Sequence, residues 1–337
     1  MGWTAVEVLT RPCPRGCPTK PSAPTGRALT YARPVADSRR GILLGTAAYL
    51  MWGAFPLYFP LLDPAGSLEI LAHRIVWSVV VVVALVVALG HLPQLRAIAA
   101  DRRTRTLLGL AAVTITFNWA TYIYAVTHDR VVEAALGYFI NPLVTVLMGV
   151  LLLGERLRRL QWIAMGVATT AVVVLTVDYG HPPYLALVLA FSFGTYGLAK
   201  KTADVGAVES LGFETSLIAP FALAYLLWLA SSGDSTFVSE GAGHTVLLAS
   251  TGIATAVPLI CFGAAATRVP MVTLGLLQYL APVLQFGLGV LYFHEDMPAG
   301  RWIGFVLVWV ALAIFTVEAT QHRRRQLRLV AAASPAL

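Results

Sequence analysis

Residues 137–163 read GYFINPLVTVLMGVLLLGERLRRLQWI, and residues 277–303 read LQYLAPVLQFGLGVLYFHEDMPAGRWI. The two stretches match at a fixed offset of 140 positions, so the chain carries an internal repeat. They differ in charge, because the first contains three arginines in its segment ERLRR and the second contains a single arginine near its end. The matched pairs are Pro142/Pro282, Gly149/Gly289, Val150/Val290, Leu151/Leu291, Glu155/Glu295, Trp162/Trp302 and Ile163/Ile303.

The composition indicates a chain that lies in a lipid bilayer. It is 58% hydrophobic and 12% charged, whereas soluble domains are roughly 25% charged. Residues 75–90, IVWSVVVVVALVVALG, contain no charge, and about 20 apolar residues cross the hydrocarbon core as a helix. Backbone groups find no water partners there, and this run lacks the alternation of period two that marks a membrane barrel. We therefore predict an all-α polytopic membrane protein.

Charged or Pro- and Gly-rich breaks divide the apolar sequence into ten segments, each of which we expect to form a transmembrane helix. The segments lie near 41–61, 70–89, 106–126, 133–153, 160–177, 183–199, 210–230, 245–266, 272–293 and 301–319. With the N-terminus in the cytoplasm, the inside segments hold 21 of the 24 Lys and Arg residues, as the positive-inside rule requires. Both termini are therefore expected to be cytoplasmic. The formal charge of +7 comes from residues at the ends of spans, beside anionic lipid, so we expect no nucleic-acid partner.

The offset of 140 positions covers five of the ten helices. Because five is odd, the second copy enters the membrane from the opposite side, and equivalent loops face opposite compartments. This explains why the inside copy keeps its arginines and the outside copy has lost them. We expect inverted five-helix repeats at 39–178 and 179–320, flanked by a disordered cytoplasmic N-terminal tail, 1–38, and a cytoplasmic C-terminal tail, 321–337. Inverted repeats of this kind are typical of secondary transporters.

Five stretches also carry a resemblance to a known family. They are EILAHRIVWS, EAALGYFINPLVTVLMGVLLLGERLRRLQWIA, FSFGTYGLAKK, VPLICFGAAATRVPMVTLGLLQYLAPVLQFGLGV and WVALAIF. Over residues 38–322 the chain resembles the RarD branch of the EamA-type drug/metabolite transporters, although its long N-terminal tail departs from the usual pattern. The resemblance implies ten helices in two inverted repeats in a bacterial plasma membrane. Members of that branch are named for chloramphenicol sensitivity, and related families export small metabolites and drugs.

Two prolines occupy matched positions near the middle of the membrane. Pro142 and Pro282 each lie about ten residues into a predicted span, and each removes one backbone hydrogen bond. One interpretation is a tolerated kink; the other is a helix break at a substrate site where the repeats meet. Polar and aromatic side chains at similar depth are the candidate substrate contacts: Trp52, Asn118, Trp119, Tyr122, Tyr138, Asn141, Tyr196, Gln278, Tyr279 and Gln285.

Charged residues inside spans are costly and therefore point to function. Arg74, which follows His73, lies a turn into the second span from outside, and Glu214 lies at the equivalent place in the seventh span from inside. Because their depths are opposite, we expect Arg74 to pair with Glu133 at the outer mouth rather than with Glu214. These four residues are candidates for gating or coupling; the alternative is that they are interfacial anchors that snorkel to the surface. Glu214 is expected to reach one of three inner basic residues, Lys200, Lys201 or Arg268.

We therefore predict a secondary transporter that moves a small neutral or zwitterionic organic solute by alternating access, with export as one direction and proton coupling through Glu214 or His73 as one mechanism. The chain has no G-x-x-x-x-G-K-[ST] loop for nucleotides, which excludes ATP-driven pumping by this chain alone. It also has no H-E-x-x-H or G-x-S-x-G motif, so a membrane-embedded enzyme or a sensor is the weaker alternative, and a channel lacks its filter. No metal or cofactor is expected, and the predicted partners are the solute, protons and membrane lipids.

Overall fold

The computed structural model describes residues 35–153, 157–203, 205–266, 268–269 and 277–333. In this described part every regular element is a helix, in agreement with the all-α prediction. In chain order the elements are α1 (Val35–Gly53), α2 (Phe55–Tyr58), the short 3₁₀ helix η1 (Phe59–Leu62), α3 (Ser67–Ala88), α4 (Leu92–Ala100), α5 (Arg102–Thr127), α6 (Val131–Leu153), α7 (Arg159–Tyr179), α8 (Tyr184–Ala203), α9 (Ala207–Ser232), α10 (Gly241–Ala266), α12 (Leu280–Leu291) and α13 (Ala299–Ala333).

Seven of the described helices are long and apolar enough to cross a membrane, namely α3, α5, α6, α7, α9, α10 and α13. Helix α1 and the α2–η1 segment form a pair bent by 45° and add an eighth span if they are taken together. Helices α8 and α12 are shorter apolar helices at the places of the predicted sixth and ninth spans, and residues 272–276 of the ninth lie outside the described residues. The chain is a polytopic helical protein, while the count of ten spans and the inverted repeat stay predictions.

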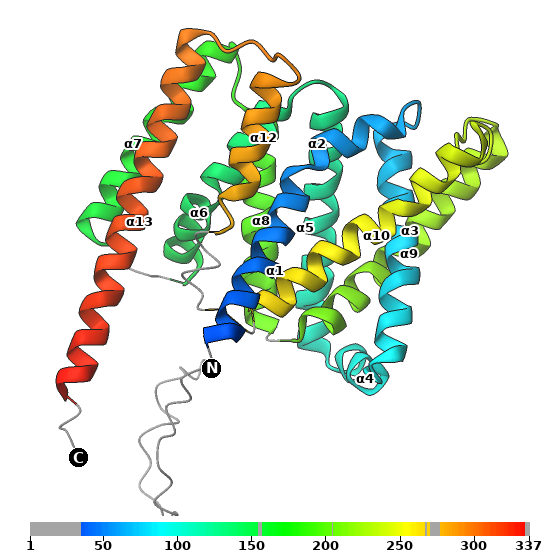
Figure 1. Ribbon diagram of the computed structural model, residues 1–337, viewed down its shortest axis with the longest axis horizontal. Helices are drawn as coiled ribbons and strands as arrows, with labels where there is room; N and C mark the ends of the chain where they lie inside the picture. Colours follow the sequence, from blue (N-terminus) through cyan, green and yellow to red (C-terminus); the bar gives the residue numbers. More distant parts are fainter. Residues whose placement is uncertain (1–34, 154–156, 204, 267, 270–276, 334–337) are drawn as a thin grey trace, which may run out of the picture. The chain divides into compact units, whose positions relative to one another are not determined.

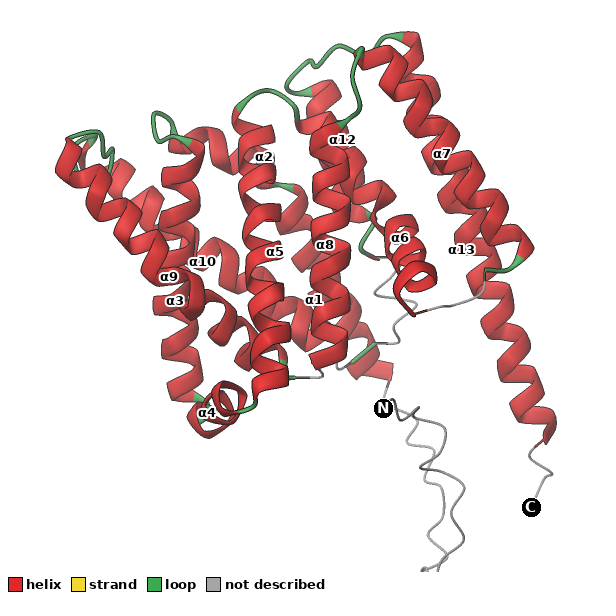
Figure 2. Cartoon of the chain, turned by 180° about the vertical axis from the view of Figure 1, so that it is seen from behind, coloured by secondary structure: helices red, strands yellow, loops and turns green. Residues whose placement is uncertain are grey.

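Most of the long helices of the unit that begins at Ala36 lie side by side and run between the same two ends (Figure 1). The start of α1 and the end of α13 lie at one end in both Figures 1 and 2, and α4 lies at that end as well. The loops that follow η1, α5, α7, α9 and α12 lie at the other end (Figure 1). This alternation agrees with helices that cross in turn, because an even number of crossings returns the chain to its starting side.

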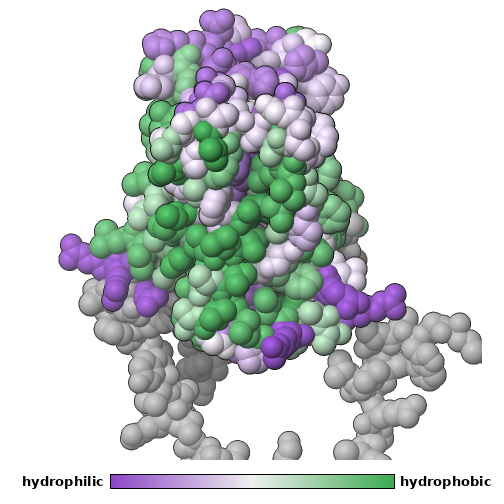
Figure 3. Space-filling model, turned by 90° about the vertical axis from the view of Figure 1, so that its right-hand side faces the viewer, coloured by the Kyte–Doolittle hydropathy of each residue, from purple (hydrophilic) through white to green (hydrophobic). Residues whose placement is uncertain are grey.

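Apolar side chains fill two clusters and also cover the outside. The first cluster joins α6, α7, α8 and α13, and the second joins α2, η1, α3 and α5 with two residues of α6 and single residues of α8, α9 and α10. Figure 3 shows a hydrophobic belt between two hydrophilic ends. Many large apolar side chains of the described helices are widely exposed, for example Phe117, Trp228 and Leu151. A surface of this kind is suited to lipid tails rather than to water.

Local sequence explains where several helices begin and end. Asp101 caps α5, because its side chain accepts a hydrogen bond from the Thr104 backbone N–H at 2.8 Å. Helices α7 and α9 end at Gly180 and Gly233, whose φ angles are 72° and 83°. A residue with a Cβ atom would be strained in this left-handed conformation, so glycine suits both ends.

The two matched prolines lie in different local structures. Helix α6 continues through Pro142, so this conformation has no helix break there. A helix in lipid tolerates the proline because only one backbone hydrogen bond is lost. Pro282 lies in the first turn of α12, where the backbone N–H would have no partner within the helix in any case.

Candidate functional site

Asn118 joins three helices, α5, α6 and α8. Its side chain is buried, and its Nδ2 atom donates to the Leu189 carbonyl and to Ser192 Oγ, both at 3.0 Å. Its Oδ1 atom accepts a hydrogen bond from the Tyr138 hydroxyl at 3.2 Å. Two predicted substrate contacts, Asn118 and Tyr138, therefore bind each other and hold α5 against α6 and α8.

A second polar contact joins α12 to α1. Gln285 is buried, and its Nε2 atom donates to the Trp52 carbonyl at 3.1 Å. The Trp52 ring packs against Tyr49 and Phe262. The Gln285 Oε1 atom and the Asn141 Oδ1 atom of α6 are buried and have no hydrogen-bond partner among the described residues. Because such atoms are costly to leave unpaired, these two amide oxygens are candidate acceptors for a ligand.

The two remaining candidates from the predicted ninth span lie just before α12. Gln278 and Tyr279 are half-buried, and Tyr279 packs against the apolar cluster of α6, α7, α8 and α13. Their contacts with the preceding residues, 270–276, lie outside the described part of the chain. The aromatic body of Tyr279 therefore contributes to packing in this conformation.

Glu214 is the most deeply buried carboxylate among the residues that the structure describes, with 1% of its surface exposed. The Lys200 Nζ atom of α8 lies 3.3 Å from Glu214 Oε1, and the same ammonium donates to the Tyr196 hydroxyl at 3.0 Å. Lys200 is one of the three inner partners expected from the sequence. The contact brings the candidates Tyr196 and Glu214 into one polar cluster between α8 and α9.

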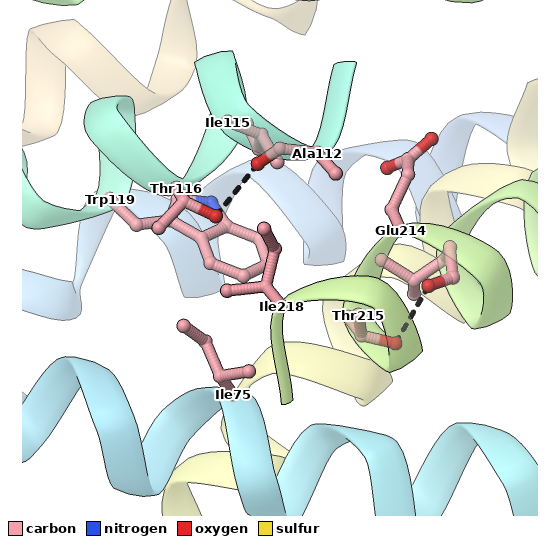
Figure 4. A pocket seen from close by; sticks show the side chains of 9 residues that line it. Ile75, Ala112, Ile115, Thr116, Trp119, Glu214, Thr215 and Ile218 are labelled. Atoms are coloured by element: carbon pink, nitrogen blue, oxygen red, sulfur yellow. Dashed lines mark hydrogen bonds between the residues drawn. The ribbon is translucent and has the colours of Figure 1, made fainter. Parts of the chain in front are cut away.

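Glu214 also lines a small pocket between α3, α5 and α9 (Figure 4). The Trp119 indole points from α5 toward Ile218 of α9, and Thr116 and Thr215 bond to their own helix backbones. The interior free volume is about 10 Å³, room for about one water molecule. In this conformation the pocket is therefore too small for an organic solute.

Arg74 lies in a cage of aromatic rings. Its guanidinium carbon lies 4.4 Å from the ring centroid of Trp119, 5.3 Å from that of Phe55 and 5.9 Å from that of Phe59. Its Nε atom donates to Thr255 Oγ1 of α10 at 2.9 Å. A desolvated cation–π contact contributes up to about 2 kcal/mol, which offsets only part of the cost of a buried charge. The residue is 5% exposed, so it is not an anchor that snorkels to the surface.

The expected pair between Arg74 and Glu133 is absent from this conformation. Glu133 instead forms an ion pair with Arg130, whose Nη2 atom lies 2.5 Å from Glu133 Oε2, and its Oε1 atom accepts from the Leu185 backbone N–H at 3.2 Å. Arg130 lies three residues before Glu133, so the turn that begins α6 brings the two together, whereas Arg74 points from α3 toward α10. This conformation therefore does not bring the predicted pair together, and the pairing of Arg74 with Glu133 in a shut outer mouth stays a prediction.

His73 lies in a separate polar cluster below the α9–α10 loop. Its ring stacks on Phe237 with centroids 4.7 Å apart, and neither ring nitrogen has a hydrogen-bond partner among the described residues. Nearby, Glu69 accepts from the Thr236 backbone N–H at 2.8 Å and from its hydroxyl at 3.0 Å. That hydroxyl also contacts His244 Nε2 at 2.9 Å. His73 is buried, so it too is not a snorkelling anchor.

The Arg74 and Glu214 sites occupy equivalent places in the expected repeats. Arg74 and Glu214 are 140 positions apart. Phe55 and Phe59, whose rings contact Arg74, lie 141 positions before Tyr196 and Lys200 of the Glu214 cluster, which is one position more than the repeat offset. The same slip of one position aligns Gly53 with Gly194. The equivalent pairs are Arg74/Glu214, Phe55/Tyr196 and Phe59/Lys200.

Glu295 makes a polar contact between distant segments that the predicted site residues do not include. Its carboxylate accepts from the backbone N–H of Val131 at 2.6 Å and of Val132 at 3.1 Å, at the first turn of α6. Burial raises the pKa of Glu295 to about 7, against the lowering effects of these two donors and of Arg301. Glu295 was visible in the sequence as one member of the Glu155/Glu295 repeat match.

Comparisons with known proteins agree with this architecture. Residues 39–177 match the model of the EamA-like transporter family. The chain is 54% identical to Protein RarD of Streptomyces exfoliatus, over 89% of this chain and 95% of that protein. It is 41% identical to Protein RarD of Escherichia coli, over 86% and 98%, and 39% identical to the uncharacterized transporter YojE of Bacillus subtilis, over 86% and 97%.

A solved crystal structure, described only as that of a protein, shares the fold with a TM-score of 0.54 and 21% identity, over 83% of this chain and 98% of that one. The relatives are far above the identity at which proteins share a family, and they are matched over almost their whole lengths. Their names are those of membrane transporters and of RarD proteins. The chain therefore belongs to the EamA-like transporter family, within its RarD branch.

Proposed function

We propose that the chain is a secondary active transporter that moves a small organic solute across the bacterial plasma membrane by alternating access between two inverted five-helix repeats. Export is the direction we assign, with both termini in the cytoplasm. The family model matches residues 39–177, nearly the same range as the proposed first repeat, 39–178. Related proteins are named transporters, which supports transport of a solute by this chain.

The observation that carries the proposal is a pair of matched contacts between α7 and α13. At one end of the pair, Gln161 Nε2 donates to Glu318 Oε2 at 3.0 Å. At the other end, Arg301 Nε donates to Asp178 Oδ2 at 3.4 Å. Gln161 and Arg301 are 140 positions apart, and so are Asp178 and Glu318. A two-fold axis in the membrane plane that exchanges the repeats would generate both contacts from one, as in transporters built from inverted repeats.

Two close helix contacts support the same symmetry. A Cβ atom added to Gly53 of α1 would lie 2.9 Å from the Leu284 side chain of α12. A Cβ atom added to Gly194 of α8 would lie 3.6 Å from the Val144 side chain of α6. Leu284 and Val144 are 140 positions apart. These contacts, of α1 with α12 and of α8 with α6, support the proposal that one repeat rocks against the other.

Flux through reconstituted protein tests the proposal. Liposomes that contain the full chain should take up at least one solute from a panel of labelled amino acids, organic acids and chloramphenicol, with saturation and above empty liposomes. In the proton-coupled form of the proposal, Glu214→Gln abolishes accumulation driven by a pH gradient and retains exchange of the same solute, because only accumulation requires a titrating group. A folded protein that moves no member of the panel would count against transport, and unchanged accumulation would count against coupling through Glu214.

Alternating access has its own measurement. In a variant whose Cys13, Cys17 and Cys261 are replaced by serine, single cysteines at Asn141 and Thr215 report opposite sides of the proposed solute path. The transported solute should change their labelling by an impermeant maleimide in opposite directions, since one mouth closes when the other opens. Labelling that rises or falls together at both positions would contradict a two-mouth mechanism.

A further inference from the structure

The Arg74 guanidinium is buried and makes one hydrogen bond, through its Nε atom, within the described part of the chain. Arg74 is the only lysine or arginine with a buried side chain among the residues whose exposure the structure describes. Its Nε atom is bound to Thr255 and its face lies on aromatic rings, but its two terminal nitrogens have no hydrogen-bond acceptor in the described part of the chain. No carboxylate of the described residues lies within 4.0 Å of it. A guanidinium in these surroundings offers a planar fork of donors to a group that the protein does not supply.

A second donor without a partner lies close by. Tyr122 is 3% exposed, and its hydroxyl is buried without a hydrogen-bond partner among the described residues. Its ring packs against Phe59, which itself faces Arg74, with centroids 6.0 Å apart. The phenol is close enough to interact electrostatically with the guanidinium. A buried guanidinium bonded only through Nε and a buried hydroxyl without a partner in the described part of the chain together favour a negatively charged ligand.

We propose that Arg74, with Tyr122, binds the carboxylate of a monocarboxylate solute whose aromatic or apolar body lies against Phe55, Phe59 and Trp119. This inference rests on the proposed transport function and names the chemical class of the solute. One guanidinium matches one carboxylate, because its two terminal nitrogens form parallel hydrogen bonds with the two oxygens. Phosphate carries more charge and would need further cations, and the aromatic walls favour an organic anion over a small, strongly hydrated one.

The thermal stability of the purified full-length protein tests the site, with phenylacetate and its neutral amide, phenylacetamide, as probes at equal ionic strength. Phenylacetate should raise the melting temperature, and phenylacetamide should not, because only the former carries the anion. Arg74→Gln should weaken the apparent affinity for phenylacetate at least about tenfold, and Arg74→Lys should keep part of it, since lysine retains the charge without the fork. Arg96→Gln, which removes an exposed arginine of α4, is the matched control and should leave the response unchanged.

Tyr122→Phe is the second variant, in case Arg74→Gln does not fold. It removes a hydroxyl that has no partner, so its unliganded stability should equal or exceed that of the wild type, while its affinity for phenylacetate falls about fivefold. Equal stabilisation by phenylacetate and phenylacetamide would overturn the proposal. So would an unchanged phenylacetate response in either Arg74→Gln or Tyr122→Phe.

The outcomes separate this inference from the proposed function. If the protein moves a neutral solute and Arg74→Gln leaves its KM unchanged, transport stands and the carboxylate site is wrong. If phenylacetate binding depends on Arg74 but no solute crosses the liposome membrane, the site stands and the transport mechanism is wrong.

Discussion

At the scale of single residues, the buried polar groups fall into two kinds. Asn118 satisfies its amide with partners on α6 and α8, and so acts as a structural link. The second kind has no hydrogen-bond partner among the described residues and comprises the amide oxygens of Gln285 and Asn141 and the hydroxyl of Tyr122. Because an unpaired buried polar atom costs about 1–3 kcal/mol, we propose the second kind as the positions where a solute gains affinity. Residue type alone does not separate the two.

Glu295 gives a prediction about pH. Its pKa is raised from 4.5 to about 7 by burial, so between these values the folded state binds a proton that the unfolded chain does not. Its contribution to stability is therefore fully present below about pH 4.5 and is lost as pH rises through about 7. We expect the melting temperature of the solubilised wild type to fall from pH 5 to pH 8, and Glu295→Gln to reduce this fall.

Asp296→Asn is the matched control for that measurement. Asp296 is the exposed neighbour of Glu295, so its replacement should leave the wild-type pH profile unchanged. If Glu295→Gln and Asp296→Asn shared the same profile, the pH dependence would not arise from the carboxylate that binds the start of α6.

At the scale of helices, close approach depends on glycine at particular positions. A Cβ atom added to Gly252 of α10 would lie 2.5 Å from the Trp77 carbonyl carbon of α3, whereas one added to Gly243 of the same helix would meet nothing within 4 Å. The Trp77 backbone cannot move aside in the way that the flexible end of a side chain can. Helices α3 and α10 therefore pack as closely as they do because position 252 lacks a side chain, and this places Thr255 against Arg74.

Alanine at these two glycines should change stability in opposite directions. Gly252→Ala should destabilise the protein by about 1–3 kcal/mol, the usual cost of an overpacked contact. Gly243→Ala should stabilise it by up to about 1 kcal/mol, because alanine is the better helix former. Unfolding of the solubilised protein in denaturant measures both changes. Changes of the same sign and size would show that the α3–α10 contact does not limit the packing.

At the scale of the whole molecule, the prediction concerns topology. A reporter fused after Leu337 should be cytoplasmic and one inserted after Asp234 should be outside, because basic residues gather at the one end and acidic residues at the other. The start of α1 and the end of α13 lie at the same end of the unit, opposite the α9–α10 loop (Figure 1). Enzymatic reporters that are active on only one side of the membrane measure this directly. A C-terminus outside would remove both the ten-span count and the inverted-repeat argument.

The sequence by itself determined that the chain lies in lipid, that its fold is all-α and which family it belongs to. Long uncharged runs require helices in lipid, and the offset of 140 positions between Pro142 and Pro282 predicts the repeat. Arg74 and Glu214 were recognised because charge inside a span is costly whatever the fold. None of these inferences depends on the direction in which a side chain points.

Only the tertiary structure decided which groups meet. Arg74 faces aromatic rings and Thr255 instead of Glu133, and α6 continues through Pro142. The physical reason is that lipid and protein interior are both apolar, so a span that is hydrophobic on every side does not reveal which face packs against its neighbours. The rotation of each helix, and with it the partner of each buried polar group, follows from close contacts such as that at Gly252, which form between segments far apart in the chain.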